Sequence, residues 1–375
     1  MHVAFNKPYM TGRELWRIRQ AHAGGHLSGD GPFTKKCEAW FERKTHCKRA
    51  LLTHSCTGAL EMAGLLSSLK AGDEVILPSY AFVSTANAFV LRGARPVFVD
   101  IRPDTLNIDE KKIEKAITKK TRAIVALHYG GIACEMDAIL AVAKKRGLIV
   151  IEDAAQGVLC TYKGRPLGSM GDFGVYSFHE TKSIISGEGG ALLVHDQSRV
   201  GRAEIIREKG TDRSRFLRGQ TDKYTWQDIG SSYLPSDIIA AFLWGQLEVA
   251  ERIIQKRMGL WRKYHEAFAA AEKKGKLRRP TVPAGCRHNA HLYYLILPTG
   301  AKRNAFIRET NRRGINTVFH YVPLHSSPAG RRFGRVSGVL KNTDAMSGRL
   351  VRLPLWIGME KHLPRVIDTV LELIS

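Results

Sequence analysis

An acidic residue and a lysine each follow an apolar, strand-like run in the middle of the chain. The run 149–151 ends on Glu152-Asp153, and the run 173–178 is followed by Lys182. In an open α/β sheet, side chains at strand ends project into the crevice where ligands bind. Such a pair suits pyridoxal phosphate (PLP), which needs a lysine for its Schiff base and a carboxylate facing its pyridinium nitrogen. Either residue alone is more typical of a helix cap or a solvated surface.

The ordered motifs around these two residues are far more specific than either residue alone. The segments EDAAQ (152–156), SFHETK (177–182) and GEGG (187–190) follow one another in the chain. With them, the sequence resembles the DegT/DnrJ/EryC1/StrS family of sugar aminotransferases, PLP enzymes that share the aspartate-aminotransferase fold. The resemblance extends over nearly the whole chain, from Asn6 to LPL (353–355). It implies an α/β protein of fold type I, with a large, mostly parallel mixed-sheet domain and a smaller C-terminal α+β domain.

The resemblance implies a catalytic role for Lys182 and Asp153. Lys182 would hold the cofactor as an internal aldimine. Once displaced by the amino donor, it would act as the base of the proton shift that gives pyridoxamine phosphate (PMP) as intermediate. A lysine suits this task because its neutral amine is the nucleophile, and partial burial lowers its pKa. Asp153 would keep the pyridine nitrogen protonated, which preserves the ring as an electron sink.

The resemblance also assigns binding roles by position. The expected cofactor-binding residues are Thr57, Gly58, Phe82, Asp153, Gln156, Ser177, Lys182 and Ser232. The expected substrate-binding residues are His179, Arg207, His320 and Tyr321. No metal site is expected, because the cysteines and histidines lack the spacing of zinc ligands.

The cofactor phosphate is expected at a small-residue turn around Thr57. A helix predicted to begin there presents free N–H groups and its positive dipole end, and Gly58 lets an anion approach the backbone. The competing interpretation is an ordinary helix cap without a ligand. The resemblance favours the phosphate site, because family members bind the cofactor phosphate at the matching turn. Family members also contact the phosphate from the neighbouring subunit through a Gly-x-Asn-Tyr-Arg segment. That segment is GSSYL (230–234) in this chain, with Ser232 at the Asn position.

The expected reaction also follows from the resemblance. The segments FHETK (178–182), IIREKGT (205–211) and FHY (319–321) resemble members that transfer the amino group of L-glutamate to C4 of a dTDP-4-keto-6-deoxyhexose. The product would be dTDP-4-amino-4,6-dideoxygalactose, for a surface polysaccharide. The expected partners are this nucleotide sugar, L-glutamate and a second copy of the chain, in a homodimer with shared active sites. The alternative is the same chemistry on another keto-sugar nucleotide, at C3 or with the gluco product.

Two further functions are compatible with this fold. A sugar 3-dehydratase carries a histidine in place of the Schiff-base lysine, so Lys182 argues against it. A PLP-fold regulator of nucleic acid would use the positive charge of the chain, in which 58 Lys and Arg face 35 Asp and Glu. The formal net charge is +23, yet the basic residues are scattered and form no tail. A solvated basic surface is therefore favoured, and neither nucleic acid nor a membrane is an expected partner.

Composition indicates a cytoplasmic protein with more than one lobe. A chain of 375 residues can bury a sizeable core and suggests two or three lobes. The six cysteines form no CxxC pair, which is typical of reduced thiols in the cytosol. No basic-then-apolar leader and no apolar run of membrane-spanning length is found, so the expected location is cytoplasmic.

The order of predicted elements indicates two domains. Continuous apolar runs predict buried, mostly parallel strands at 74–78, 95–100, 122–128, 148–152, 174–178 and 191–195. The basic stretch 208–227 lacks periodicity and predicts a functional loop. Beyond a long helical connector, the expected elements are a strand at 291–297, a helix at 301–313, a strand at 316–322 and helices at 343–352 and 364–374. We expect an N-terminal arm and large PLP-binding domain over 1–245, and a connector helix and small domain over 246–375.

Overall fold

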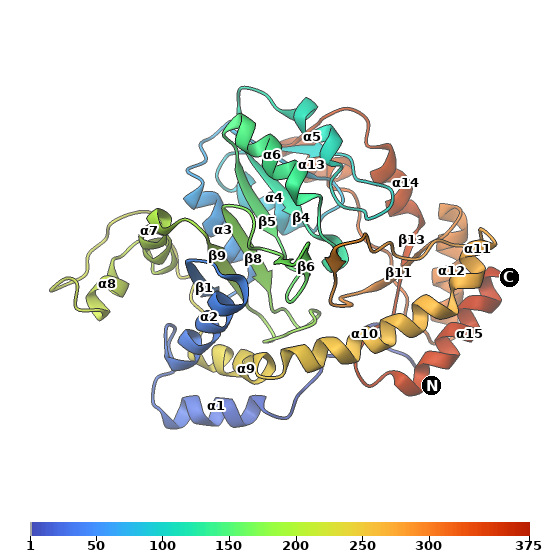
Figure 1. Ribbon diagram of the computed structural model, residues 1–375, viewed down its shortest axis with the longest axis horizontal. Helices are drawn as coiled ribbons and strands as arrows, with labels where there is room; N and C mark the ends of the chain where they lie inside the picture. The colour runs from blue at the N-terminus through green and yellow to red at the C-terminus, as the bar shows by residue number, and fades with distance from the viewer. Residues whose placement is uncertain (1) are drawn as a thin grey trace.

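A large mixed sheet forms the centre of the computed structural model, which describes residues 2–375 (Figure 1). Its eight strands lie in the order β1-β9-β8-β5-β4-β2-β3-β12. The neighbours from β8 to β12 are parallel, whereas β9 is antiparallel to both β1 and β8. The strands are β1 (Arg49–Thr53), β2 (Glu74–Pro78), β3 (Arg95–Val99), β4 (Thr121–Leu127), β5 (Ile149–Asp153), β8 (Phe173–Ser177), β9 (Gly190–Val194) and β12 (Arg335–Val336). The predicted α/β fold with a mostly parallel mixed sheet is confirmed.

Helices cover both faces of this sheet because its strands are apolar on both faces. On one face, α2, α6 and α9 pack with Ile76 and Val97, and on the other, α3, α4 and α7 pack with Val75 and Leu77. Alternate residues of one strand thus enter different cores. The helices are α2 (Pro32–Thr45), α3 (Cys56–Leu66), α4 (Val83–Val90), α6 (Met136–Arg146), α7 (Gln197–Arg207) and α9 (Asp237–Leu247).

A smaller C-terminal lobe lies at the far end of the long helix α10, beside both chain termini (Figure 1). Its own core contains Trp261, Tyr293 and Val366, and Val3 of the N-terminal arm is buried there as well. Its elements are α10 (Ala250–Ala267), α11 (Ala269–Lys273), β11 (Tyr293–Ile296), α12 (Gly300–Arg312), α14 (Lys341–Arg349), β13 (Leu350–Leu353) and α15 (Leu363–Ile374). The predicted domain boundary after residue 245 falls inside α9, and the division stays a prediction.

One predicted strand of the C-terminal lobe is wrong, and one predicted helix is present but ends earlier than expected. The segment 316–322 is not a strand, because Val318 alone exchanges backbone hydrogen bonds with Arg352 and the chain then turns to the cavity wall. The helix predicted over 343–352 ends at Arg349. The following residues form β13, whose apolar side chains are buried when it pairs with β11.

The remaining elements are short or peripheral. They are α1 (Glu14–Ala23), α5 (Glu110–Ala116), η1 (Tyr129–Gly131), β6 (Thr161–Tyr162), β7 (Arg165–Pro166), α8 (Arg213–Leu217), β10 (Cys286–Arg287), η2 (Leu324–Ser326), α13 (Pro328–Phe333) and η3 (Glu360–His362). The short helix α8 interrupts the stretch 208–227, which projects away from the sheet (Figure 1). Within residues 2–375, no helix is long and apolar enough to span a bilayer.

Candidate active site

A cavity of about 500 Å³ lies where β5 and β8 end, beside the start of α3 and the small lobe. Because these two strands are parallel neighbours, their carboxyl ends meet at one edge of the sheet. The N-terminal arm contributes Phe5 and Asn6 to the wall. The predicted site residues that line the cavity are Thr57, Phe82, Asp153, Gln156, Ser177, His179, Lys182, His320 and Tyr321.

Asp153 is held rigidly at the end of β5. One carboxylate oxygen accepts a hydrogen bond from the Thr85 hydroxyl at 2.7 Å, and the other accepts one from the Ala155 N–H at 3.1 Å. The side chain is buried, yet no Lys, Arg or His of residues 2–375 lies within ion-pair distance of it. A buried carboxylate without a cation is costly, so this geometry suits a positively charged ligand atom such as a pyridinium N–H.

Lys182 follows β8 in a turn that its own N–H closes by donating to the carbonyl of His179 at 2.8 Å. Burial lowers the pKa of Lys182 below its usual value, and the charge of Arg352 adds to this effect, while Cys56 and Asp153 oppose it. The neutral amine is therefore more populated near neutral pH than in an exposed lysine. That is the form able to attack a carbonyl carbon or accept a proton.

The start of α3 provides the expected anion site. The side chain of Ser55 caps the helix by accepting a hydrogen bond from the Gly58 N–H at 3.0 Å. The hydroxyl of Thr57 lies 2.8 Å from that of Ser84, and both residues line the cavity. The first-turn N–H groups and the helix dipole favour an anion here, and Ser177 adds a hydroxyl from β8.

The glycine-rich turn is needed for close packing between β9 and this helix start. A Cβ on Gly190 would lie 2.5 Å from the backbone nitrogen of Cys56, which is closer than Cβ atoms approach. Gly190 thus lets the last residues before α3 lie directly against the sheet. We infer that any side chain at this position would displace the anion site.

Aromatic and imidazole rings from the small lobe form the opposite wall. The hydroxyl of Tyr129 lies 2.9 Å from Nδ1 of His320, which fixes the orientation of that ring. Burial lowers the pKa of His320 well below its usual value, and the Arg352 charge adds to this, so the ring is neutral near pH 7. The amide of Gln156 donates to the hydroxyl of Tyr321 at 3.1 Å and so links the two lobes across the cavity.

The donor set fits PLP. One cavity is lined by the buried carboxylate of Asp153, the amine of Lys182 and the helix start at Thr57. They match the pyridine nitrogen, the aldehyde carbon and the phosphate of that cofactor in chemistry. The ring of Phe82 also lines the cavity and is 57% exposed, so its face is available for stacking.

Comparison with known protein families decides which family this is. The model of the DegT/DnrJ/EryC1/StrS aminotransferase family matches residues 8–371. The chain belongs to this family. The expectation of a transaminase is thereby confirmed.

The aminotransferase is similar to proteins from bacteria and an archaeon. It is 35% identical to the uncharacterized protein MJ1066 of Methanocaldococcus jannaschii over 92% of this chain and 91% of that protein. It is 33% identical to the spore coat polysaccharide biosynthesis protein SpsC of Bacillus subtilis, over 100% and 97% of the two chains. Its structure is similar to that of the aminotransferase TlmJ from Streptoalloteichus hindustanus, with a TM-score of 0.91 at 30% identity, over 100% and 99% of the chains.

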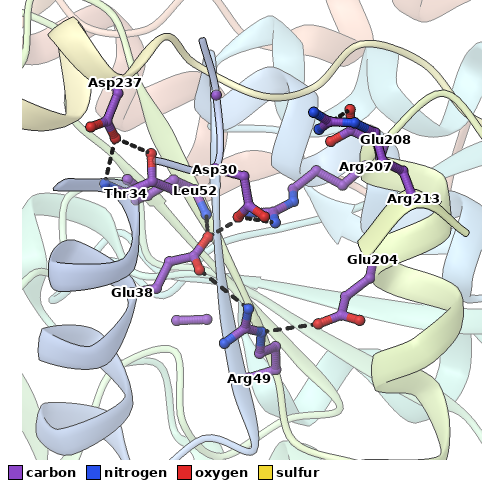
Figure 2. Close-up of polar contacts among 12 residues, drawn as sticks. Asp30, Thr34, Glu38, Arg49, Leu52, Glu204, Arg207, Glu208, Arg213 and Asp237 are labelled. Carbon is purple, nitrogen blue, oxygen red and sulfur yellow. Dashed lines mark hydrogen bonds and ion pairs between the residues drawn. The ribbon is translucent and has the colours of Figure 1, made fainter. Parts of the chain in front are cut away.

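Arg207 of the aminotransferase does not line the cavity, which corrects its expected role in substrate binding. It is only 1% exposed and lies at the end of α7, where its guanidinium pairs with Glu38 of α2 and, at 2.9 Å, with Asp30 (Figure 2). Arg49 pairs with Glu38 from the other side. Burial raises the pKa of Glu38, while Arg207 and Arg49 oppose that rise. The motif IIREKGT (205–211) therefore supplies a structural ion pair.

Gly58 and Ser232 also lie outside the lining of the cavity. Gly58 packs instead against Tyr233 and His54, and a Cβ there would lie 3.1 and 3.2 Å from these side chains. Ser232 is exposed and forms a backbone bridge with Glu208. Its expected contact is with the phosphate of a neighbouring subunit, and this stays a prediction.

Several lining residues were not predicted from the sequence. They are Cys56, Ser84, Thr85, His128, Glu188, His291 and Arg352, among others. Thr85 and Ser84 follow Phe82, the expected stacking residue, so their proximity in sequence was an available signal. Arg352 directly precedes the segment LPL (353–355), which was part of the resemblance.

Removing the buried cation at position 207 should destabilise the aminotransferase without altering substrate affinity. Arg207→Met leaves the buried carboxylate of Glu38 with Arg49 as its remaining cation and removes the partner of the partly buried Asp30, which costs up to about 3–5 kcal/mol. Urea unfolding monitored by circular dichroism at pH 7 measures the difference. The control Arg213→Met breaks a partly exposed pair with Glu208 and should cost about 1 kcal/mol or less. A stable Arg207→Met protein with a raised KM would instead restore the substrate-binding role.

Proposed function

We propose that the aminotransferase uses PLP to move an amino group from L-glutamate to the keto carbon of a sugar nucleotide. The observation that carries the proposal is the placement of Asp153 and Lys182 on one cavity. Two similar proteins support it. SpsC is named a spore coat polysaccharide biosynthesis protein, and structures of Spr1654 from Streptococcus pneumoniae, 25% identical, include PLP and PMP forms.

The residues of the chain divide the work between binding and proton transfer. When bound, the cofactor supplies an electron sink and, in its PMP form, carries the amino group. Asp153 holds a proton on the ring nitrogen, since its carboxylate has no other cation within reach. Lys182 moves the proton between the substrate carbon and the cofactor side of the cavity. Thr57 and Ser177, which line the cavity, would bind the phosphate, and Phe82 would cover the ring and exclude water.

The proposed acceptor is a dTDP-4-keto-6-deoxyhexose, aminated at C4 to the galacto product as by dTDP-4-amino-4,6-dideoxygalactose transaminase. The resemblance at FHY (319–321) supports this choice, because His320 and Tyr321 line the cavity. The motif at 205–211 supports it less, because Arg207 is buried elsewhere. Amination at C3 and the gluco product are the alternatives within the same chemistry.

The six unpaired cysteines support a cytoplasmic location.

We further propose a homodimer in which each chain completes the site of the other. The segment GSSYL (230–234) matches the one through which family members reach the neighbouring phosphate. Its Ser232 is exposed, and the apolar side chains of Trp226 and Ile229 nearby are 83% and 50% exposed. Apolar groups left in water on one surface are typical of an area that a second copy covers. Ser232 would contact the phosphate directly or through a water.

Replacing Lys182 should abolish turnover and leave the fold intact. Lys182→Ala removes both the attachment point and the proton carrier, so we expect transamination to fall by about 10³-fold or more. Steady-state rates and far-ultraviolet circular dichroism measure the two effects. Lys209→Ala, an exposed lysine outside the cavity, is the control. Near wild-type transamination by Lys182→Ala would sink the assignment.

Neutralising Asp153 should lower turnover without weakening the binding of the cofactor or the substrates. Asp153→Asn retains the shape of the side chain but no longer keeps the ring nitrogen protonated. We expect turnover to fall by about 100-fold or more, as when one preorganised electrostatic contact is lost at a reacting centre. Cofactor retention after gel filtration and the KM of both substrates should change little. Unchanged turnover with loss of the bound cofactor would show that Asp153 has a different role.

The substrate proposal is tested by product stereochemistry. Lys182 delivers its proton from one side, so the configuration at C4 depends on which face of the sugar is turned towards it. After reaction of dTDP-4-keto-6-deoxyglucose with L-glutamate, proton NMR of the product should show the small H3–H4 coupling of an axial amine. A large coupling would show that the product is the gluco epimer and would contradict the galacto assignment. A panel of other keto-sugar nucleotides tests the remaining alternatives.

A further inference from the structure

Arg257 of the helix α10 is a buried arginine that binds main-chain carbonyls. It is only 5% exposed. Its Nε donates to the carbonyl of Ala290 at 3.1 Å, and its Nη2 donates to those of His291 at 2.9 Å and Leu355 at 3.2 Å. Burial lowers its pKa to about 10, so it stays charged at pH 7, yet no carboxylate of residues 2–375 lies within 4.0 Å of it. A buried charge without a counter-ion is costly, so we expect it to have a specific task.

The three carbonyls belong to segments that form the cavity wall or lead to it. His291 and Leu355 line the cavity. Ala290 has a φ of 52°, in the left-handed region that is unfavourable for a residue with a side chain, so its turn needs support from its surroundings. Its N–H donates to Nδ1 of His288 at 3.2 Å, and Arg257 holds its carbonyl. The turn that leads to His291 is therefore fixed on both sides of Ala290.

The preceding residue, Asn289, ties the same turn to the large lobe. Its amide donates to the carbonyls of Gln156 and Val158 at 3.0 and 2.9 Å. Gln156 lines the cavity and is an expected cofactor-binding residue. Asn289 and Arg257 together therefore set where His291 lies relative to the cavity.

The imidazole of His291 is the side chain that this turn places on the cavity wall, which Lys182 also lines. Its buried Nδ1 has no hydrogen-bond partner among residues 2–375. Burial lowers the pKa of His291 well below its usual value, and the charges of Lys182 and Arg257 add to this effect. The ring is therefore neutral near pH 7, and a neutral imidazole has one nitrogen that can accept a hydrogen bond.

Lys182 needs such an acceptor while it carries a proton. Its amine is then an ammonium with three N–H donors in buried surroundings. No carboxylate of the described residues, 2–375, lies within 4.0 Å of it, and Asp153 is proposed to face the cofactor nitrogen. A carboxylate would raise the pKa of the lysine strongly, whereas a neutral imidazole accepts an N–H with a smaller effect.

We propose that Arg257 is a positioning residue that acts through His291. It fixes the imidazole beside Lys182, where the ring accepts a hydrogen bond from the ammonium group while the lysine carries its proton. This inference rests on the proposed function. Arg257 itself does not line the cavity, so its influence passes through the carbonyls that it binds.

The contact between His291 and Lys182 is tested by nitrogen-15 NMR of the histidine rings in the PMP-loaded protein, where the lysine is free. His291→Leu identifies the His291 signals. Lys182→Ala removes the donor and Arg257→Gln releases the ring, so both should shift these signals. The control Arg303→Gln should leave them unchanged, because Arg303 binds two carbonyls of the small lobe outside the cavity. His291 signals that do not respond to Lys182→Ala would refute the contact.

A double-mutant cycle tests whether Arg257 acts through His291. The change in absorbance of the bound cofactor on mixing with L-glutamate gives the rate of the first half-reaction. His291→Leu should lower kcat by about 100-fold, the effect of a lost hydrogen bond to a charged group, and change KM by less than about threefold. Arg257→Gln should lower kcat by about 10- to 100-fold, because a small misplacement of a group at the reacting centre costs this much. The double variant should be within about threefold of His291→Leu, since the two losses are not independent.

Two further variants complete the cycle. Arg257→Lys keeps a donor for part of the carbonyls, so we expect an intermediate loss of kcat, and it serves as the test if Arg257→Gln does not fold. Arg303→Gln should keep the wild-type kcat even where it lowers the midpoint of urea unfolding, because its carbonyls lie outside the cavity.

The possible failures are distinguishable. If the wild-type cofactor absorbance responds to no amino acid, the proposed function fails and the inference falls with it. If wild type responds to L-glutamate and His291→Leu or Arg257→Lys responds equally well, the proposed function stands and the positioning role is refuted. Losses that add up in the double variant would show that Arg257 acts independently of His291, which also refutes it.

Discussion

The parallel pairing of β5 with β8 is the interaction on which the candidate site depends. It brings Asp153, at the end of one strand, and Lys182, just beyond the other, to the same edge of the sheet. Glu152 holds the chain between these strands, since its buried carboxylate accepts hydrogen bonds from the N–H groups of Gly168 and Gly171 at 2.8 and 2.7 Å. Burial alone would raise the pKa of Glu152, but the hydrogen bond to His128 and the charge of that ring, together with the two glycine N–H groups, outweigh burial and the pKa is lowered.

The small lobe and the N-terminal arm complete the cavity that the large sheet begins. Phe5 and Arg352 meet there, and His320 and Tyr321 turn towards the same space from the segment after Val318. The net charge of +23 comes from basic residues that are scattered over the chain. Such charges are solvated at the surface, so the net charge does not indicate a function. The charges that can act on a ligand are the few that lie on the cavity wall. Their effect is stronger there because the surroundings have a low dielectric constant.

Much of the large domain could be predicted from the sequence, because strands covered on both faces are continuous apolar runs with chemistry at their ends. The motifs around Asp153 and Lys182 were therefore found directly. Arg207 was misassigned because a motif does not reveal whether its arginine faces a cavity or a buried carboxylate, here Glu38 of a helix about 170 residues away. The strand β13 was missed because its pairing with β11 overrides the local helical pattern, and with it the position of Arg352 was missed.

The central claim is that Lys182 is the residue to which the cofactor attaches, and peptide mapping tests it most directly. The protein is loaded with PLP, treated with sodium borohydride so that any lysine–cofactor bond becomes permanent, digested and analysed by mass spectrometry. Our account predicts that the pyridoxyl group is found on the peptide containing Lys182, and that the Lys182→Ala protein carries none at any specific position. A pyridoxyl group on a different lysine of the native protein, with Lys182 unmodified, would contradict it.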